Sequence, residues 1–211
     1  ALESSLSEHA NSALAEKTIQ SVLGFLGAGK GGTRTSVSSW KQAYIGLLQS
    51  QDSGRWQGYN LIYVNDDAIP ELVEIGNDEA TGCKIVSFAD GAADETQLSR
   101  LSFSYIERRN LLCNSEGNMD CYYDIVYSME SGRLIPIASG YYGAEDNSNV
   151  QFDDEGNPIY QYKWEGVMMT REEYNQAFRA VYDTSSEKPG YEWGKWFSLE
   201  EVIQAIGDIP F

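Results

Sequence analysis

Hydrophobic and polar positions follow the period of a β-strand through the centre of the chain and the period of a helix on either side of it. The clearest strand pattern lies between Tyr59 and Gly76, where the β-rich runs 61–64 and 69–75 flank the polar turn 65–68. Polar turn chemistry between two such runs is typical of a hairpin. The sequence therefore predicts an antiparallel β-hairpin near the start of the fold.

A helix and a glycine-rich linker are predicted at the beginning of the chain. An apolar stripe with helical spacing runs through residues 6–26. Glycines are so dense over 27–35 that a helix cannot continue there. We therefore expect residues 1–35 to form a helical arm with its linker, and residues 36–211 to form a single α+β domain.

The rest of the chain alternates between these two patterns in a defined order. A helix is predicted over 40–49, with Ser38 or Ser39 as its cap. After the first hairpin, further strands are predicted over 83–88, 122–129, 134–142 and 159–164. Two helices then close the chain behind pairs with capping-box spacing: Thr170 and Glu173, and Ser198 and Glu201. This order predicts an α+β fold, an antiparallel β-meander with helices at both ends packed on one face.

Charge and length limit the classes of partner. The chain has 211 residues with 15 basic and 32 acidic side chains, for a net charge of −17. Such a surface repels phosphate backbones and anionic membranes, so we expect no nucleic acid partner. No apolar run reaches the length of about 20 residues that a membrane-spanning helix needs, so no transmembrane segment is expected. Because the chain starts at Ala1 without a signal sequence, we expect an exported protein whose signal has been removed.

A group of motifs resembles a known sequence family. The first hairpin carries Asn65, Asp67, Ile69, Pro70, Glu71 and Leu72 after the aromatic-rich segment 40–45. The segments 122–127, 137–140 and 170–174 also match. Over about 40–182 the chain resembles uncharacterised exported proteins and lipoproteins of Firmicutes that have a D-x-D-x-I-P-E-L hairpin. The resemblance implies export, an extracellular or cell-surface setting and a single α+β domain, and it implies no activity. Members commonly have Gly where this chain has Ala68.

The cysteines leave two interpretations open. Cys113 and Cys121 flank residues 114–120 and could face each other across a hairpin, which would leave Cys83 unpaired. The alternative is that all three are buried, reduced thiols.

Three acidic turns are candidates for calcium, since alternating acids on a tight loop offer several oxygen ligands at once. They are the turn of Asn65, Asp66 and Asp67, the segment 114–120 and the segment 153–157. None has the order of an EF-hand loop, and the same residues are typical of hairpin turns. The first turn is the best metal candidate, and no cofactor other than calcium is predicted.

Motifs for known catalytic chemistries are incomplete. The glycine-rich segment 24–30 lacks the Ser or Thr that must follow Lys30 in a phosphate-binding loop. Ser38 and Lys41 have S-x-x-K spacing, but the K-T-G element of penicillin-binding enzymes is absent. The one histidine, His9, lies in the predicted arm, which argues against a histidine-based site in the main domain. The remaining enzymatic hypothesis is a carboxylate-dependent glycan hydrolase.

The aromatic residues suggest a binding function. Tyr160, Tyr162 and Trp164 alternate along one predicted strand and should face the same side of the sheet, with Tyr141 nearby. These four are the predicted ligand-binding residues, because Tyr and Trp offer flat, amphipathic surface to a glycan or a protein. The alternative is that helices cover this face. The leading hypothesis is thus a non-enzymatic surface binding protein. The other hypotheses are the hydrolase and a structural module whose arm mediates assembly, and the sequence leaves the oligomeric state open.

Overall fold

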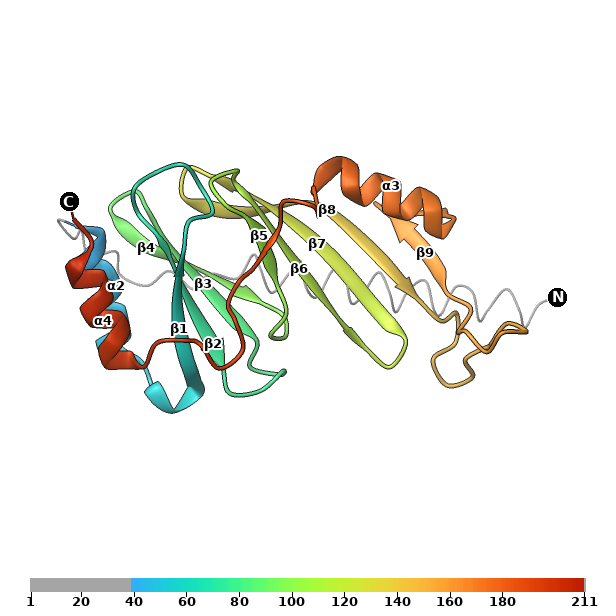
Figure 1. Ribbon diagram of the computed structural model, residues 1–211, viewed down its shortest axis with the longest axis horizontal. Helices are drawn as coiled ribbons and strands as arrows, with labels where there is room; N and C mark the ends of the chain where they lie inside the picture. The colour runs from blue at the N-terminus through green and yellow to red at the C-terminus, as the bar shows by residue number, and fades with distance from the viewer. Residues whose placement is uncertain (1–38, 211) are drawn as a thin grey trace. The chain divides into compact units, whose positions relative to one another are not determined.

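The structure of the protein is a computed structural model in which residues 39–210 are described (Figure 1). The arm and linker predicted over 1–35 lie outside the described residues. The described chain forms three α-helices, α2 (Trp40–Ser50), α3 (Arg171–Val181) and α4 (Leu199–Asp208), together with two antiparallel sheets. The predicted α+β class is therefore confirmed, and the strands divide between two sheets.

The first sheet, sheet A, has four strands in sequence order. They are β1 (Trp56–Ile62), β2 (Glu71–Gly76), β3 (Cys83–Ala89) and β4 (Ala92–Leu98). The predicted hairpin is the β1–β2 pair, in which Ile62 lies opposite Glu71. A short 3₁₀ helix, Ser53–Arg55, connects α2 to β1.

The second sheet, sheet B, has seven strands in the order β10-β9-β8-β7-β6-β5-β11. Their bounds are β5 (Ser104–Ile106), β6 (Leu111–Asn118), β7 (Cys121–Glu130), β8 (Arg133–Gly143), β9 (Gln161–Trp164), β10 (Val167–Met169) and β11 (Lys188–Pro189). The predicted hairpin around Ser131 and Gly132 is the β7–β8 pair. Both turn residues have positive φ, 51° and 75°, as a two-residue hairpin turn requires.

Two long strands have no counterpart in the sequence prediction. β4 is polar and mostly half-buried, so its composition does not distinguish it from a loop. β6 continues through residues 114–118, which the sequence suggested were a loop. It can do so because the connection to β7 is only the pair Met119 and Asp120, whose φ values are 50° and 62°.

This register corrects one interpretation of the cysteines. Cys113 lies opposite Val126 and Cys121 lies opposite Asn118, so the two do not face each other. All three cysteines are free thiols. Cys83 and Cys113 are buried, whereas Cys121 is half-buried.

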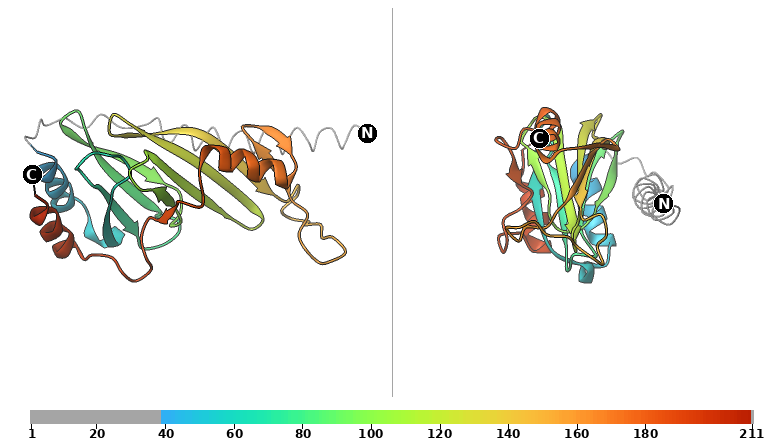
Figure 2. Two further views of the ribbon diagram at one scale, coloured as in Figure 1. Left: turned by 45° about the horizontal axis from the view of Figure 1, so that its top comes forward. Right: turned by 90° about the vertical axis from the view of Figure 1, so that its right-hand side faces the viewer.

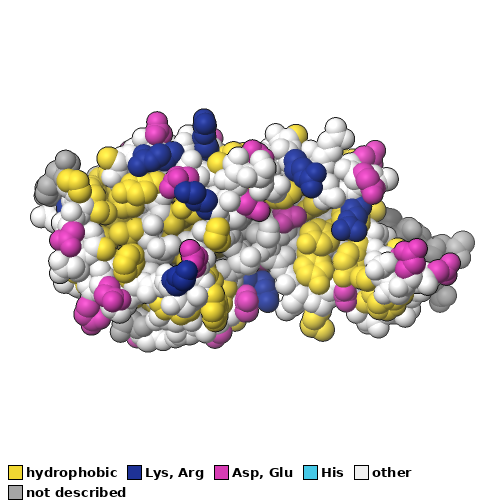
Figure 3. All heavy atoms as spheres, viewed as in Figure 1, with side chains coloured by type: hydrophobic (Ala, Val, Ile, Leu, Met, Phe, Trp, Pro, Cys, Tyr) yellow, Lys and Arg dark blue, Asp and Glu magenta, His cyan; other side chains and the backbone are white. Residues whose placement is uncertain are grey.

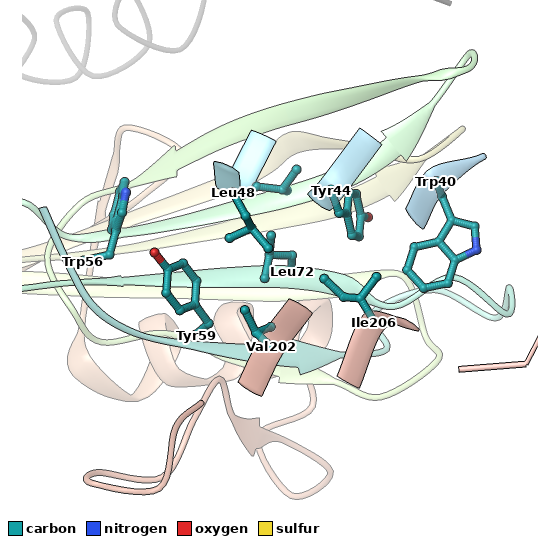
Figure 4. Packing of buried hydrophobic residues seen from close by; sticks show 9 residues of the cluster. Trp40, Tyr44, Leu48, Trp56, Tyr59, Leu72, Val202 and Ile206 are labelled. Atoms are coloured by element: carbon teal, nitrogen blue, oxygen red, sulfur yellow. The ribbon is translucent and has the colours of Figure 1, made fainter. Parts of the chain in front are cut away.

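Helices α2 and α4 lie side by side on one face of sheet A (Figures 1 and 2). Their apolar faces form a core with β1, β2 and β3, which contains Trp40, Tyr44, Leu48, Trp56, Tyr59, Leu72, Val86, Val202 and Ile206 (Figure 4). The Lys41 ammonium group donates hydrogen bonds to the Gly207 carbonyl at 2.9 Å and to the Ile209 carbonyl. It thereby caps the carboxyl end of α4, where a positive charge interacts favourably with the helix dipole.

Helix caps appear where the sequence predicted them. Ser39 caps α2, accepting a hydrogen bond from the Gln42 backbone N–H. The pairs Thr170/Glu173 and Ser198/Glu201 form complete capping boxes at the amino ends of α3 and α4. Local side-chain chemistry thus fixes where all three helices begin.

Polar contacts connect the two sheets. The Asn110 N–H donates to the Val64 carbonyl at 2.8 Å, directly after β1. The fully buried Asn114 side chain of β6 binds the segment after β4: its amide donates to the carbonyls of Ser99 and Ser102, each at 2.9 Å. A buried amide with its partners satisfied fixes one relative position of the elements it connects.

We expect Leu48→Ala to destabilise the protein by about 2–5 kcal/mol, because Leu48 is 1% exposed in the core between α2 and sheet A. The measurement is urea unfolding followed by circular dichroism. Gln49→Ala on the same helix is the control, since Gln49 is exposed and its replacement should change stability by less than about 0.5 kcal/mol. Equal effects of the two variants would contradict the burial of Leu48 between α2 and sheet A.

Candidate functional site

The predicted aromatic residues do not all share one surface. Trp164 is buried, and α3 covers it: its ring centroid lies 5.6 Å from that of Tyr174 and 5.8 Å from that of Phe178. Tyr141 lies opposite Lys163, whereas Tyr142 lies opposite Tyr162. Since neighbouring residues of a strand face opposite sides, Tyr141 is on the far face of the sheet from Tyr162 and Trp164.

Three tyrosines of adjacent strands stack on the face of sheet B that α3 partly covers. Tyr122, Tyr142 and Tyr162, which we call the tyrosine ladder, come from β7, β8 and β9. Neighbouring rings have centroids 5.0 and 5.7 Å apart and interplanar angles of 19° and 11°. Parallel rings this close would collide if they lay side by side in one plane, so they stand on edge and stack through their faces. All three are half-buried, which leaves part of the ladder open to solvent.

Tyr160 extends the ladder and attaches a loop to it. Its ring centroid lies 6.0 Å from that of Tyr122 and 6.3 Å from that of Tyr142. Its hydroxyl donates a hydrogen bond to the Asp120 carboxylate at 2.5 Å, and this bond raises the pKa of Tyr160. The Ala144 N–H donates to the Asp120 carbonyl at 2.8 Å. Both ends of the loop 144–160 are therefore held at the β6–β7 turn.

This loop, which we call the acidic arm, contains five acidic residues and no Lys or Arg: Glu145, Asp146, Asp153, Asp154 and Glu155. Its outer part folds back on itself, with the Ile159 N–H donating to the Gln151 carbonyl at 2.8 Å. Phe152 and Ile159 are 61% and 54% exposed on this part. In Figure 3, hydrophobic side chains gather over the part of sheet B beside α3, and both acidic and basic side chains border them.

A buried hydrogen bond holds α3 against the ladder. The Tyr174 hydroxyl donates to the Asp124 carboxylate at 2.6 Å, and the Ser115 hydroxyl donates to the same group at 2.6 Å. Burial and the Asp124 charge raise the pKa of Tyr174, so its hydroxyl stays protonated as the donor. The Tyr174 ring also meets Tyr142 and Tyr162 edge-on, with centroids 5.8 and 5.6 Å away.

The turn of Asn65, Asp66 and Asp67 uses its oxygens within the turn. The Asp67 carboxylate accepts hydrogen bonds from the Ile69 N–H at 2.7 Å and from the Asn65 side-chain amide at 2.8 Å. The Arg108 guanidinium donates to the Asp67 carbonyl at 3.0 Å and lies 3.8 Å from the Asp66 carboxylate. Within residues 39–210, no three His, Cys, Asp or Glu side chains are grouped so as to hold a metal ion.

Two carboxyl groups of β2 are buried. Glu71 is 2% exposed and accepts a hydrogen bond from the Val64 N–H at 2.7 Å. Its burial raises its pKa to about 8, against the opposing effect of that hydrogen bond. Glu74 is fully buried, and its pKa is raised by burial although the Lys84 ammonium lies 3.1 Å away. Three residues apart on one strand, the two carboxyl groups point to opposite faces of sheet A, so they do not form a catalytic pair.

Comparisons with known proteins give little information. No protein-family model matches the chain, and no curated protein matches it. One solved structure, of a Xanthomonas type IV secretion system related protein, matches with a TM-score of 0.36 and 16% sequence identity. The match covers 53% of this chain and 56% of that chain. A likeness this weak carries no argument about function, and the resemblance to the Firmicutes group stays a prediction.

None of the helices within residues 39–210 has both the length and the apolar character needed to cross a membrane.

We predict that Tyr174→Phe destabilises the protein by about 1–3 kcal/mol, because the buried Asp124 carboxylate then loses one of its two hydroxyl donors. Thermal unfolding measures the change. Gln176→Ala, at an exposed position of the same helix, serves as the control and should have little effect. If Tyr174→Phe unfolds with the native midpoint, the buried bond contributes nothing to the position of α3.

The raised pKa of Glu71 predicts how the stability of the protein depends on pH. Its pKa in the folded protein, about 8, exceeds the ordinary value of 4.5. The contribution of this shift to the free energy of unfolding is complete below pH 4.5. It is lost as the pH rises from 4.5 through about 8, because in this range Glu71 ionises in the unfolded protein but not in the folded one. Urea unfolding across this range should therefore show stability falling with pH. Glu71→Gln should flatten this dependence, and an unchanged slope in the variant would refute the assignment.

Proposed function

We propose that the protein is a non-enzymatic binding protein that recognises a protein partner through the tyrosine ladder, Tyr160 and the acidic arm. One observation supports this most directly. The half-exposed ladder continues into an arm on which Phe152 and Ile159 are 61% and 54% exposed. Exposed apolar side chains that lie together and are rimmed by polar groups are typical of interaction surfaces. The expected export and cell-surface location belong to the same proposal and rest on the sequence resemblance.

The geometry of the ladder favours a protein over a glycan at this surface. Sugar rings pack on the open faces of aromatic rings. Tyr142 has a ladder ring stacked on each of its faces, whereas Tyr122 and Tyr162 each stack through one face and also contact Tyr160 and Tyr174. What they offer to solvent is ring edges and hydroxyl groups, which suit the mixed polar and apolar contacts of a protein interface. Tyrosine is also enriched among the residues that dominate binding energy at such interfaces.

Charge indicates the kind of partner. The acidic arm has five carboxylates and no Lys or Arg, within a chain whose net charge is −17. Complementary charge accelerates association and fixes orientation, so the partner should carry a basic rim around an apolar centre. This chain would repel an acidic partner because of its net negative charge, which also favours a positively charged partner.

The hydrolase hypothesis receives less support. Glu71 and Glu74, the two carboxyl groups within residues 39–210 whose pKa values are raised, are shielded from solvent and face opposite sides of β2. A glycosidase needs two carboxyl groups that flank one accessible bond.

The proposal can be tested by selecting peptides from a random phage-displayed library against the purified protein. We expect the selected peptides to combine Lys or Arg with apolar residues, and their binding to weaken with added salt. The double variant Phe152→Ala/Ile159→Ala should lower their affinity at least about tenfold, which is about 1.4 kcal/mol.

Ile137→Ala is the matched control. Ile137 is 44% exposed on β8, at the bulge of the β7–β8 pair, and lies outside the ladder and the arm. Selected peptides that bind both variants equally would overturn the proposal. Binding of glycans that depends on Tyr160 and Tyr162 would instead favour a glycan at this surface.

A further inference from the structure

A second exposed aromatic site lies on the segment between β11 and α4. Trp193 is 73% exposed, an unusual state for so large an apolar side chain. It stands at the tip of a tight turn in which the Lys195 N–H donates to the Glu192 carbonyl at 3.0 Å. Gly194 supplies the positive φ, 74°, that the turn requires.

The turn is braced against the body of the protein. The Trp196 indole packs on Gly58 of β1 so closely that a Cβ atom at position 58 would lie 1.9 Å from it. Trp196 also meets Trp193 and Tyr191 edge-on, with centroids 5.4 and 6.2 Å away. Tyr191 in turn donates a hydrogen bond to the Leu101 carbonyl at 2.8 Å.

Backbone contacts on both sides complete the bracing. Phe197 and Tyr59 exchange two backbone hydrogen bonds, of 2.8 and 3.0 Å, and the Asn60 side chain donates to the Gly190 carbonyl at 2.9 Å. The turn is thus fixed in place before any ligand arrives, and little ordering entropy remains to be lost on binding.

We propose that Trp193 is a carbohydrate contact, on which one neutral pyranose ring stacks. The perpendicular contact with Trp196 occupies at most one face of the Trp193 indole, so a face remains open. The neighbouring Glu192 and Lys195 form an ion pair that is neutral overall. Their side chains supply an acceptor and a donor for sugar hydroxyl groups without selecting a charged ligand.

The size of the site favours a sugar over a protein as the occupant. A stable protein interface takes about 800 Å² from each partner. An aromatic side chain offers only about 150–250 Å², an area that one or two sugar rings cover. This inference concerns a site separate from the ladder and the acidic arm and does not depend on the function proposed for them.

The test is a titration of the full chain with cellohexaose, maltohexaose, xylohexaose and mannohexaose, measured by isothermal titration calorimetry, whose signal does not depend on the tryptophan that is replaced. We expect at least one of them to bind with a dissociation constant of about 1 mM. Trp193→Ala should weaken that binding at least about tenfold, whereas Trp193→Phe, which keeps a ring, should retain part of it. Circular dichroism checks that both variants are folded.

Ile137→Ala is the control, since it removes an exposed apolar side chain outside the ladder, the acidic arm and the Trp193 turn and should leave sugar binding unchanged. The proposal is overturned if none of the four sugars binds when its concentration is about ten times the expected dissociation constant. It is also overturned if Trp193→Ala binds as tightly as the native chain. Peptide binding at the acidic arm is a separate measurement, so either proposal can fail while the other stands.

Discussion

The hydrogen bond from the Tyr174 hydroxyl to the Asp124 carboxylate fixes α3 on sheet B, and the aromatic arrangement around it depends on that position. Asp124 is 7% exposed, so its charge needs the two hydroxyl donors that reach it. With the Tyr174 hydroxyl held by this bond, its ring lies edge-on to Tyr142, Tyr162 and Trp164. Gly140 of β8 makes room for it, because a Cβ atom there would lie 2.1 Å from the Tyr174 hydroxyl oxygen.

This arrangement also explains why the aromatic residues of one sheet have different roles. Trp164 lies under the middle of α3 and is core, while the ladder continues beyond the helix and stays half-exposed. The stacked rings stiffen β7, β8 and β9 against one another through cross-strand contacts. The acidic arm then extends from a rigid edge, held at Asp120.

Features that depend on neighbours in sequence could be predicted, and features that depend on strand register could not. The capping boxes of α3 and α4 and the β1–β2 and β7–β8 hairpins are local, and all were predicted. The division into two sheets, and the pairing of Tyr122 with Tyr142 and of Tyr142 with Tyr162, depend on contacts between distant segments. The alternation of Tyr160, Tyr162 and Trp164 could be read from the sequence. Which of these residues is buried depends on the position of α3, which could not. Trp193 was missed as well, although the dense aromatic segment 191–197 around Gly194 was a usable signal.

The segment that carries Trp193 has a further consequence for the solubility of the protein. β1 is an edge strand of sheet A, and such an edge offers unpaired backbone groups to any other extended chain. The bridge between Tyr59 and Phe197 occupies part of this edge, and the Trp196 indole covers the backbone at Gly58 next to it. The other edge, β4, carries Asp94 and Glu95, whose charges disfavour pairing with other strands. Both borders of sheet A are thus protected against aggregation, one by the protein's own chain and the other by charge.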